Sequence, residues 1–168
     1  KEVTLRGANP ENDIIQAATN PGNATQRVVY VDGQNGTGDV TIENLGIRNG
    51  FAPDNANGGG IYILKAIEGQ VSLNHLIIEN NIASKAGGGI GIAGSNVRIN
   101  HCTIRNNSIA EGANFGKGGG IIANPVNNTG NMVVTIRNSL IYENEALDNG
   151  GGVFVHGNPN WGDEHFIS

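Results

Sequence analysis

Four segments of the chain align with one another without gaps, and this internal repeat constrains the fold more than any other feature. They are residues 40–50 (VTIENLGIRNG), 71–81 (VSLNHLIIENN), 97–107 (VRINHCTIRNN) and 134–144 (VTIRNSLIYEN). Position 1 is always Val, position 3 is Ile or Leu, position 8 is always Ile, and position 11 is Asn or Gly. An internal repeat of this kind predicts a repeated structural unit.

The apolar positions of each segment have the period of a β-strand. Positions 1 and 3 are apolar, positions 6 and 8 follow the same alternation, and the phase changes once between the two pairs. Alternation with period two predicts strands, because successive side chains of a strand point to opposite faces. The change of phase predicts two short strands joined by a bend, both facing one interior.

A glycine triplet follows every segment and precedes an Ile or a Val, at residues 58–61, 87–90, 118–121 and 150–153. Glycine accounts for 27 of the 168 residues, about twice its usual share of roughly 7%. This composition excludes an ordinary helical bundle. Gly and Asn clusters supply the positive φ values that sharp corners need, so the triplets are expected to be corners or close-packed strand starts.

Equivalent valines are 31, 26 and 37 residues apart, so the strands recur while the connections vary in length. A unit of this size with about three short strands fits one turn of a coil whose strands stack in parallel on those of the next. Asn81, Asn107 and Asn144 would then form a ladder of side-chain amides. With upstream strands near residues 3–7 and 28–31, the sequence predicts about five coils.

We therefore predict an all-β protein with a single parallel β-helix domain over residues 1–168. Its first coil, residues 1–39, is less regular, residues 40–155 form regular coils, and residues 156–168 form a terminal loop. Neither end has the pattern of a capping element, and an uncapped coil presents unpaired backbone groups. We expect either a fragment of a longer solenoid or end faces that a capping partner covers.

The Gly-Gly-x-Ile and apolar-x-x-Asn pairing resembles right-handed parallel β-helix, pectin-lyase-like proteins, and the repeats of polymorphic outer-membrane-protein-type surface proteins. Those repeats carry Phe before x-x-Asn and Ala as the third residue after Gly-Gly, where this chain has Ile78, Ile104 and Ile141, and Gly. The resemblance implies a right-handed coil in a secreted or cell-surface protein.

For function, the resemblance implies a structural or adhesive passenger or stalk that recognises a polysaccharide or cell-surface glycan. One alternative is a polysaccharide lyase or glycoside hydrolase that acts on acidic polysaccharide, and another is a purely structural solenoid without a ligand. No catalytic residue is predicted, because the sequence has no Asp-Asp pair and no Gly-His-Gly or Arg-x-Lys motif. The aspartates fall outside the aligned segments, at Asp13, Asp32, Asp39, Asp54, Asp148 and Asp163.

The residues at position 9 should stack into one outward column, and they are candidate glycan contacts. They are Arg48, Glu79, Arg105 and Tyr142. Charges that alternate in this way form a salt-bridge ladder between adjacent strands, which is the simpler interpretation. The alternative is that the side chains of this column bind an acidic sugar.

The terminal loop holds the other candidate glycan contacts, which are His156, Trp161, Asp163, Glu164 and His165. A Trp face beside carboxylates is well suited to hold a sugar ring, by stacking on the face and hydrogen bonding around the edge. The alternative is a connecting loop whose Trp packs on the solenoid surface.

No cofactor is predicted. The loop from Asp32 to Asp39 has oxygen ligands for calcium, but it lacks the spacing of an EF-hand loop and is more simply a glycine-rich turn. His75 and His101 lie one coil apart at position 5, where a polar stack at the bend is favoured over a metal site. The single Cys102 lies at a core-like position and is expected to be a buried structural thiol.

The charge argues against nucleic acid as a partner, and the apolar pattern argues against a membrane span. The net charge is −5 and no run of basic residues is present, which disfavours nucleic acid. The longest apolar stretch, residues 61–64, is far too short to cross a bilayer, which takes about 20 residues.

Overall fold

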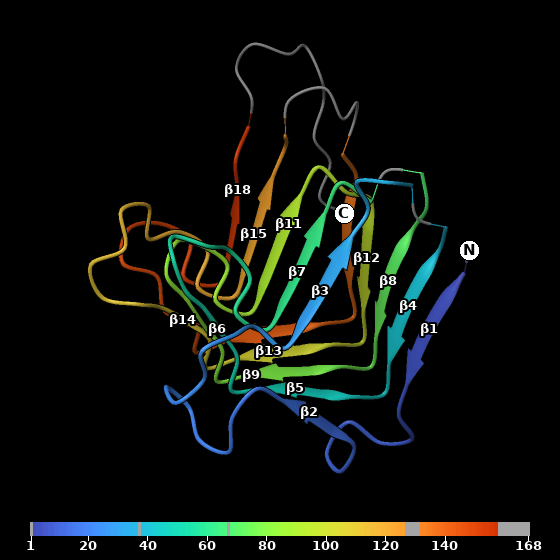
Figure 1. Ribbon diagram of the computed structural model, residues 1–168, viewed down its shortest axis with the longest axis horizontal. Helices are drawn as coiled ribbons and strands as arrows, with labels where there is room; N and C mark the ends of the chain where they lie inside the picture. The colour runs from blue at the N-terminus through green and yellow to red at the C-terminus, as the bar shows by residue number, and fades with distance from the viewer. Residues whose placement is uncertain (1, 37, 67, 127–131, 158–168) are drawn as a thin grey trace.

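The computed structural model describes residues 2–36, 38–66, 68–126 and 132–157 (Figure 1). Within these residues the chain consists of strands and loops, and no helix long and apolar enough to cross a membrane is found. The strands form three five-stranded sheets and one short three-stranded sheet, and every pairing between strands is parallel (Figure 1). The prediction of an all-β chain with parallel, repeated strands is confirmed.

Each turn of the chain contributes one strand to each of the three large sheets. The first sheet contains β1 (Val3–Arg6), β4 (Val40–Glu43), β8 (Val71–Asn74), β12 (Val97–Asn100) and β16 (Val134–Arg137). The second sheet contains β2 (Ile14–Gln16), β5 (Gly46–Arg48), β9 (Ile77–Glu79), β13 (Thr103–Arg105) and β17 (Leu140–Tyr142). The third sheet contains β3 (Val29–Asp32), β7 (Ile61–Leu64), β11 (Ile90–Ala93), β15 (Ile121–Asn124) and β18 (Val153–Val155).

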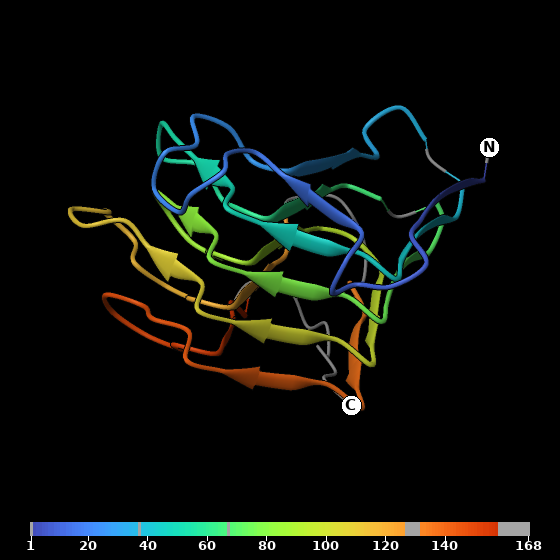
Figure 2. The same ribbon diagram turned by 90° about the horizontal axis from the view of Figure 1, so that it is seen from below.

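A short fourth sheet fills the corner between the second and third sheets. It contains β6 (Phe51–Ala52), β10 (Ile82–Ala83) and β14 (Ser108–Ile109). Figure 2 shows the successive turns stacked as layers, so the architecture is a parallel, solenoid-like β-fold with five coils.

The register between coils follows the sequence repeat. The first residues of the aligned strands pair directly, with Val3 on Val40, Val40 on Val71, Val71 on Val97 and Val97 on Val134. As a result the position-3 and position-8 side chains point into one shared core. The fully buried members of this core include Ile42, Ile47, Leu73, Ile78, Ile99 and Ile104.

Each aligned segment contains two left-handed residues, and the one at position 5 produces the change of phase in the sequence pattern. At position 5, between the first and second sheets, φ lies between 50° and 56° at Asn44, His75, His101 and Asn138. At position 10, after the second sheet, φ lies between 52° and 56° at Asn49, Asn80, Asn106 and Glu143. Asn tolerates this conformation better than most residues, which explains its frequency at these corners.

The predicted asparagine ladder is present, and it explains the third glycine of the first three triplets. Asn81 and Asn107 are completely buried and bond to one another through their side chains over 2.9 Å. A Cβ added at Gly89, the third glycine of its triplet, would lie 3.0 Å from Nδ2 of Asn107 and 2.7 Å from the carbonyl oxygen of Gly120. The first glycine of each triplet is a left-handed corner, with φ of 64° to 70°, and the third lies in a close-packed strand start that leaves room for the ladder.

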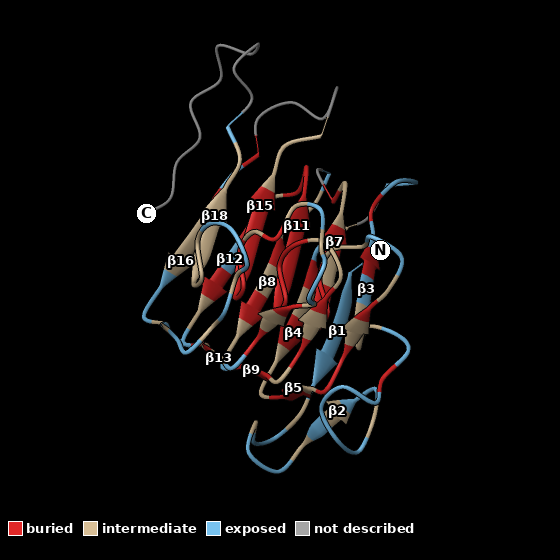
Figure 3. Cartoon of the chain, turned by 90° about the vertical axis from the view of Figure 1, so that its left-hand side faces the viewer, coloured by how far each residue is buried: buried red, intermediate tan, exposed pale blue. Residues whose placement is uncertain are grey.

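The residues of the two outermost coils are less buried than those of the middle coils (Figure 3). Val3 is 54% exposed and Leu5 is 37% exposed, whereas Ile42, one coil further along the same column, is 2% exposed. Inward-facing apolar side chains of the first coil therefore lie open at one end of the stack.

Candidate functional site

The position-9 column forms a continuous polar chain over the outer face of the second sheet. Nε of Arg48 lies 2.6 Å from Oε1 of Glu79, and Nε of Arg105 lies 2.7 Å from Oε2. Arg105 also donates to the hydroxyl of Tyr142 over 3.0 Å. Hydrogen bonds to Tyr142 and Glu79 raise the pKa of Arg105. The four residues are thus brought together as the predicted ion-pair ladder.

This geometry limits what the column offers to a ligand. Glu79 is only 7% exposed, and both of its oxygens are occupied by arginines. The two arginines in turn share one carboxylate and have further partners in Glu11 and Tyr142. Since the donors of the column face one another, its contact with a glycan stays a prediction.

Of the terminal loop, residues 156 and 157 are described, and His156 belongs to an aromatic cluster that does not include the position-9 column. The ring of His156 lies 6.2 Å from that of Phe115 and 6.4 Å from that of Phe154. Nζ of Lys117 lies over both phenyl rings, at 4.7 and 4.8 Å from their centres. The other predicted contacts lie outside the described residues, and they are Trp161, Asp163, Glu164 and His165.

Cys102 is buried, as predicted, and burial raises its thiol pKa to about 11. Its sulfur hydrogen-bonds to the carbonyl oxygens of Leu73 and Asn100 over 3.4 Å. A thiol that stays protonated at neutral pH is a poor nucleophile. Cys102 therefore belongs to the core and not to a site.

The loop considered for calcium uses its carboxylates to hold its own backbone. Oδ1 of Asp32 accepts from the backbone N–H of Gln34 over 3.0 Å, and Oδ1 of Asp39 accepts from that of Gln70 over 2.9 Å. Across the described ranges no group of three or more His, Cys, Asp or Glu side chains comes together as a metal site. This geometry is that of a glycine-rich turn.

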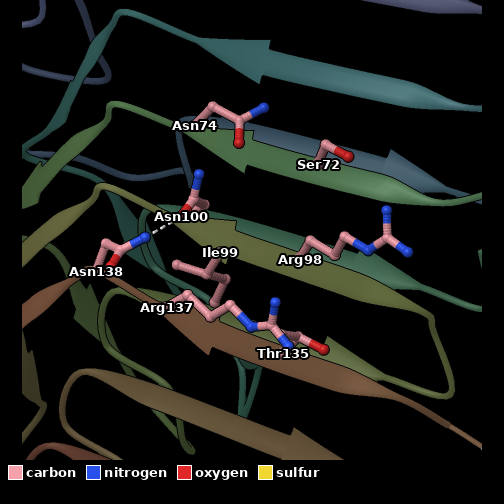
Figure 4. A pocket seen from close by; sticks show the side chains of 8 residues that line it. All are labelled: Ser72, Asn74, Arg98, Ile99, Asn100, Thr135, Arg137 and Asn138. Carbon is pink, nitrogen blue, oxygen red and sulfur yellow. Dashed lines mark hydrogen bonds between the residues drawn. The ribbon is translucent and has the colours of Figure 1, made fainter. Parts of the chain in front are cut away.

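A pocket of about 630 Å³ lies on the outer face of the first sheet, over β8, β12 and β16 (Figure 4). The pocket is open to solvent and its lining is mostly polar. The lining residues are Ser72, Asn74, Arg98, Ile99, Asn100, Thr135, Arg137 and Asn138. We call this feature the outer-face pocket.

The outer-face pocket combines two guanidinium groups with amides and hydroxyls. Arg98 and Arg137 are exposed, come from adjacent strands, and have no ion-pair partner among the residues that the structure describes. Asn138 donates to the side-chain oxygen of Asn100 over 3.1 Å, which orients both amides (Figure 4). No carboxylate lines the pocket, so its local charge is positive on a chain whose net charge is −5.

Two carboxylates, Asp39 and Glu68, line a neighbouring pocket together with Arg98, and the position-4 column holds a third in Glu43. Glu43 stands one coil before Asn74 in the position-4 column, and it forms an ion pair with Arg6. The positive charge of Arg98 and Arg137 is therefore not compensated by that column. Within the described part of the chain neither guanidinium group has an ion-pair partner, so both can bind a carboxylate or a sulfate.

The sequence interpretation did not identify the outer-face pocket. Arg98 and Arg137 are 39 residues apart, so they form no basic run, and only the coil register brings them together. The signal was nevertheless present, because positions 2 and 4 of each segment alternate outward with the buried positions 1 and 3. The Arg at position 2 of one segment and the Arg at position 4 of the next were the residues to compare.

No protein-family model, no curated protein and no solved structure matches the chain. The fold and the site define a parallel, solenoid-like β-protein with an arginine- and amide-lined pocket on one outer face. Any functional assignment therefore rests on this geometry.

Proposed function

We propose that the chain is a right-handed parallel β-helix module of a secreted or cell-surface protein, and that it binds acidic glycans in the outer-face pocket. The observation that carries the proposal is the pair of arginines, Arg98 and Arg137, which stand among amides and hydroxyls and have no ion-pair partner within the described residues. In this role the solenoid is a rigid adhesive or structural support, and the pocket is its recognition surface.

The chemistry of the lining fits an acidic sugar. A guanidinium group binds a carboxylate or sulfate through two parallel hydrogen bonds, and such charge-assisted bonds are about twice as strong as neutral ones. The side chains of Asn74, Asn100 and Thr135 offer donors and acceptors for ring hydroxyls. A pocket that is open to solvent on the face of a sheet suits a segment of a polymer.

The right-handedness of the coil is supported by a general rule of protein topology. Connections between parallel strands are right-handed in about 98% of cases, which favours a right-handed coil for an L-amino-acid chain. Val3 and Leu5 face inward but are exposed. The equivalent side chains of the middle coils are covered by the coils on either side. We propose that further coils of the same solenoid, or a capping partner, cover this end face in the complete assembly.

A purely structural solenoid is the second candidate, and the ladders favour it. The position-9 ion pairs and the buried asparagine ladder stabilise the stack without any ligand. A lyase or hydrolase needs a base, and often carboxylates, beside the sugar. The lining of the outer-face pocket offers arginines and no carboxylate.

The deciding experiment measures binding and cleavage together. The chain is incubated with polygalacturonate, dextran sulfate and neutral dextran, and calorimetry follows binding while assays for new chain ends follow cleavage. We expect binding to both acidic polymers, weakened about tenfold or more in R98Q/R137Q. R6Q, which removes an exposed arginine from the same sheet, is the matched control and should stay within about twofold.

Each other result has a defined meaning. Absence of binding to both acidic polymers, or equal binding by R98Q/R137Q, contradicts the glycan proposal and leaves the structural solenoid. New chain ends with the wild type would establish the enzymatic alternative instead.

A further inference from the structure

His75 and His101 form a stacked pair of imidazoles at the corner between the first and second sheets. Their ring centres are 4.9 Å apart and their planes differ by 1°. Both residues have a left-handed backbone, with φ of 51° and 52°. Their backbone N–H groups bond to the carbonyl oxygens of Asn100 and Arg137 in the next coils, so the register of the coils fixes their separation.

The ring nitrogens of this pair are available to a ligand. Both histidines are exposed, and among the described residues neither ring makes a hydrogen bond or ion pair. The neighbours in the position-5 column are the amides of Asn44 and Asn138, so no carboxylate of that column stands beside the rings. Imidazole without carboxylates suits Cu²⁺, Ni²⁺ and Zn²⁺, and does not suit Ca²⁺ or Mg²⁺, which prefer oxygen ligands.

We propose that His75 and His101 together bind one divalent transition-metal ion, Cu²⁺, Ni²⁺ or Zn²⁺, with water at the remaining coordination positions. Bonds of about 2.0–2.1 Å place the two nitrogens of such a site about 3 Å apart. Rotation of two exposed side chains brings the ring edges from their parallel stack to this separation, and the backbone does not move. Because the coil fixes the backbone of both histidines before the ion arrives, no loop has to be ordered when the second bond forms.

This inference is independent of the glycan proposal, because it uses different side chains. The pair adjoins the outer-face pocket through Asn74 and Asn100, the residues that precede each histidine. Binding of the ion in the absence of any glycan is therefore the primary measurement.

The chain itself supplies the substitutions for the test. Asn occupies the same left-handed corner at Asn44 and Asn138, so H75N and H101N place a residue that this corner already accepts twice. The variant H156N/H165N removes the other histidines and retains the pair as the only imidazoles. Circular dichroism compares the fold of each variant with that of the wild type.

The chain is titrated with the chlorides of Cu²⁺, Ni²⁺ and Zn²⁺ in a weakly coordinating buffer, followed by calorimetry. We expect one ion per chain in the wild type and in H156N/H165N, with affinity lowered about tenfold or more in H75N and in H101N. The electron paramagnetic resonance spectrum of the Cu²⁺ complex should show two nitrogen ligands in H156N/H165N and fewer in either single variant.

A readout without substitutions completes the test. Diethyl pyrocarbonate modifies exposed imidazoles, and mass spectrometry locates the modification. Zn²⁺ should protect His75 and His101 together. Wild-type affinity in both H75N and H101N, or loss of binding in H156N/H165N, would overturn the proposal.

Discussion

The side-chain amide of Asn81 donates to Oδ1 of Asn107 over 2.9 Å, and the backbone N–H of Asn81 reaches the same oxygen over 3.1 Å. Asn107 repeats both bonds on Asn144, over 2.9 and 3.1 Å. Each of these amides also donates to the carbonyl oxygen of an Ile in the preceding coil, and for Asn107 this is Ile78. Asn107 therefore connects three successive coils through one side chain.

Replacing Asn107 with Ala should lower the free energy of unfolding by about 3 kcal/mol or more. The substitution leaves the backbone N–H and the amide of Asn81 without their acceptor inside the core, and each buried polar group without a partner costs about 1–3 kcal/mol. Urea denaturation measures the change. N144A removes the acceptor of the backbone N–H and the amide of Asn107, which is also completely buried, so it should cost a similar amount, and wild-type midpoints for both variants would contradict the ladder's role.

Replacing Gly89 with Ala should destabilise the chain by about 2 kcal/mol or more, because the new Cβ would press on the ladder and on the carbonyl oxygen of Gly120. Gly157 is the matched control, since a Cβ there meets nothing within 4 Å. G157A should change the stability by less than about 0.5 kcal/mol. Thermal denaturation compares the two, and a neutral G89A would show that the strand start has room to adjust.

The repeated elements were predictable because each was encoded at a fixed position. Val at position 1 set the register, and the aliphatic stacks and the asparagine ladder followed from stacking equal positions. The stacked pair of His75 and His101 also followed, since both occupy position 5. The close contact between the third glycine and the ladder could not be predicted from equal positions, because it depends on the distance between atoms of different segments.

The outer-face pocket was not predictable in the same way because its residues do not repeat. Position 2 is Ser72, Arg98 or Thr135, and position 4 is Asn74, Asn100 or Arg137 on the three strands that line it. Such outward positions are under no packing constraint, so no pattern marks them as a set. Their meaning appears only when neighbouring coils are placed side by side.

Replacing Glu79 with Ala should cost about 3 kcal/mol or more in the free energy of unfolding. The carboxylate is 7% exposed and holds Arg48 and Arg105, which without it are two like charges beside one another. E79Q retains the shape and removes the charge, so it should fall between E79A and the wild type.

The exposed pair of Arg6 and Glu43 provides the control for this measurement. E43A should change the stability by less than about 1 kcal/mol, because Arg6 is largely in water. Chemical denaturation at low and high salt compares the variants. A small effect of E79A, similar to that of E43A, would mean that water compensates the arginines and that the column contributes little to stability.

Burial of Cys102 makes the stability of the fold depend on pH in the alkaline range. In the folded chain its pKa is raised to about 11, from an ordinary value of 9.0, because burial disfavours the thiolate. Between these two values the unfolded chain has lost the thiol proton and the folded chain retains it. The folded state then binds more protons, so the free energy of unfolding falls as the pH rises through this window, and the contribution is fully present below pH 9.0.

The variant C102A isolates this contribution. Tyr30 and Tyr62 also have raised pKa values, mainly through burial, and their effect has the same sign, but it is common to both proteins and cancels in the comparison. We expect wild-type stability to fall more steeply than that of C102A between about pH 8 and about pH 10.5, measured by urea denaturation under reducing conditions. Parallel pH profiles would mean that the thiol ionises as readily in the folded chain as in the unfolded one. Cys102 would then be open to water, contrary to its place beneath the position-5 corner.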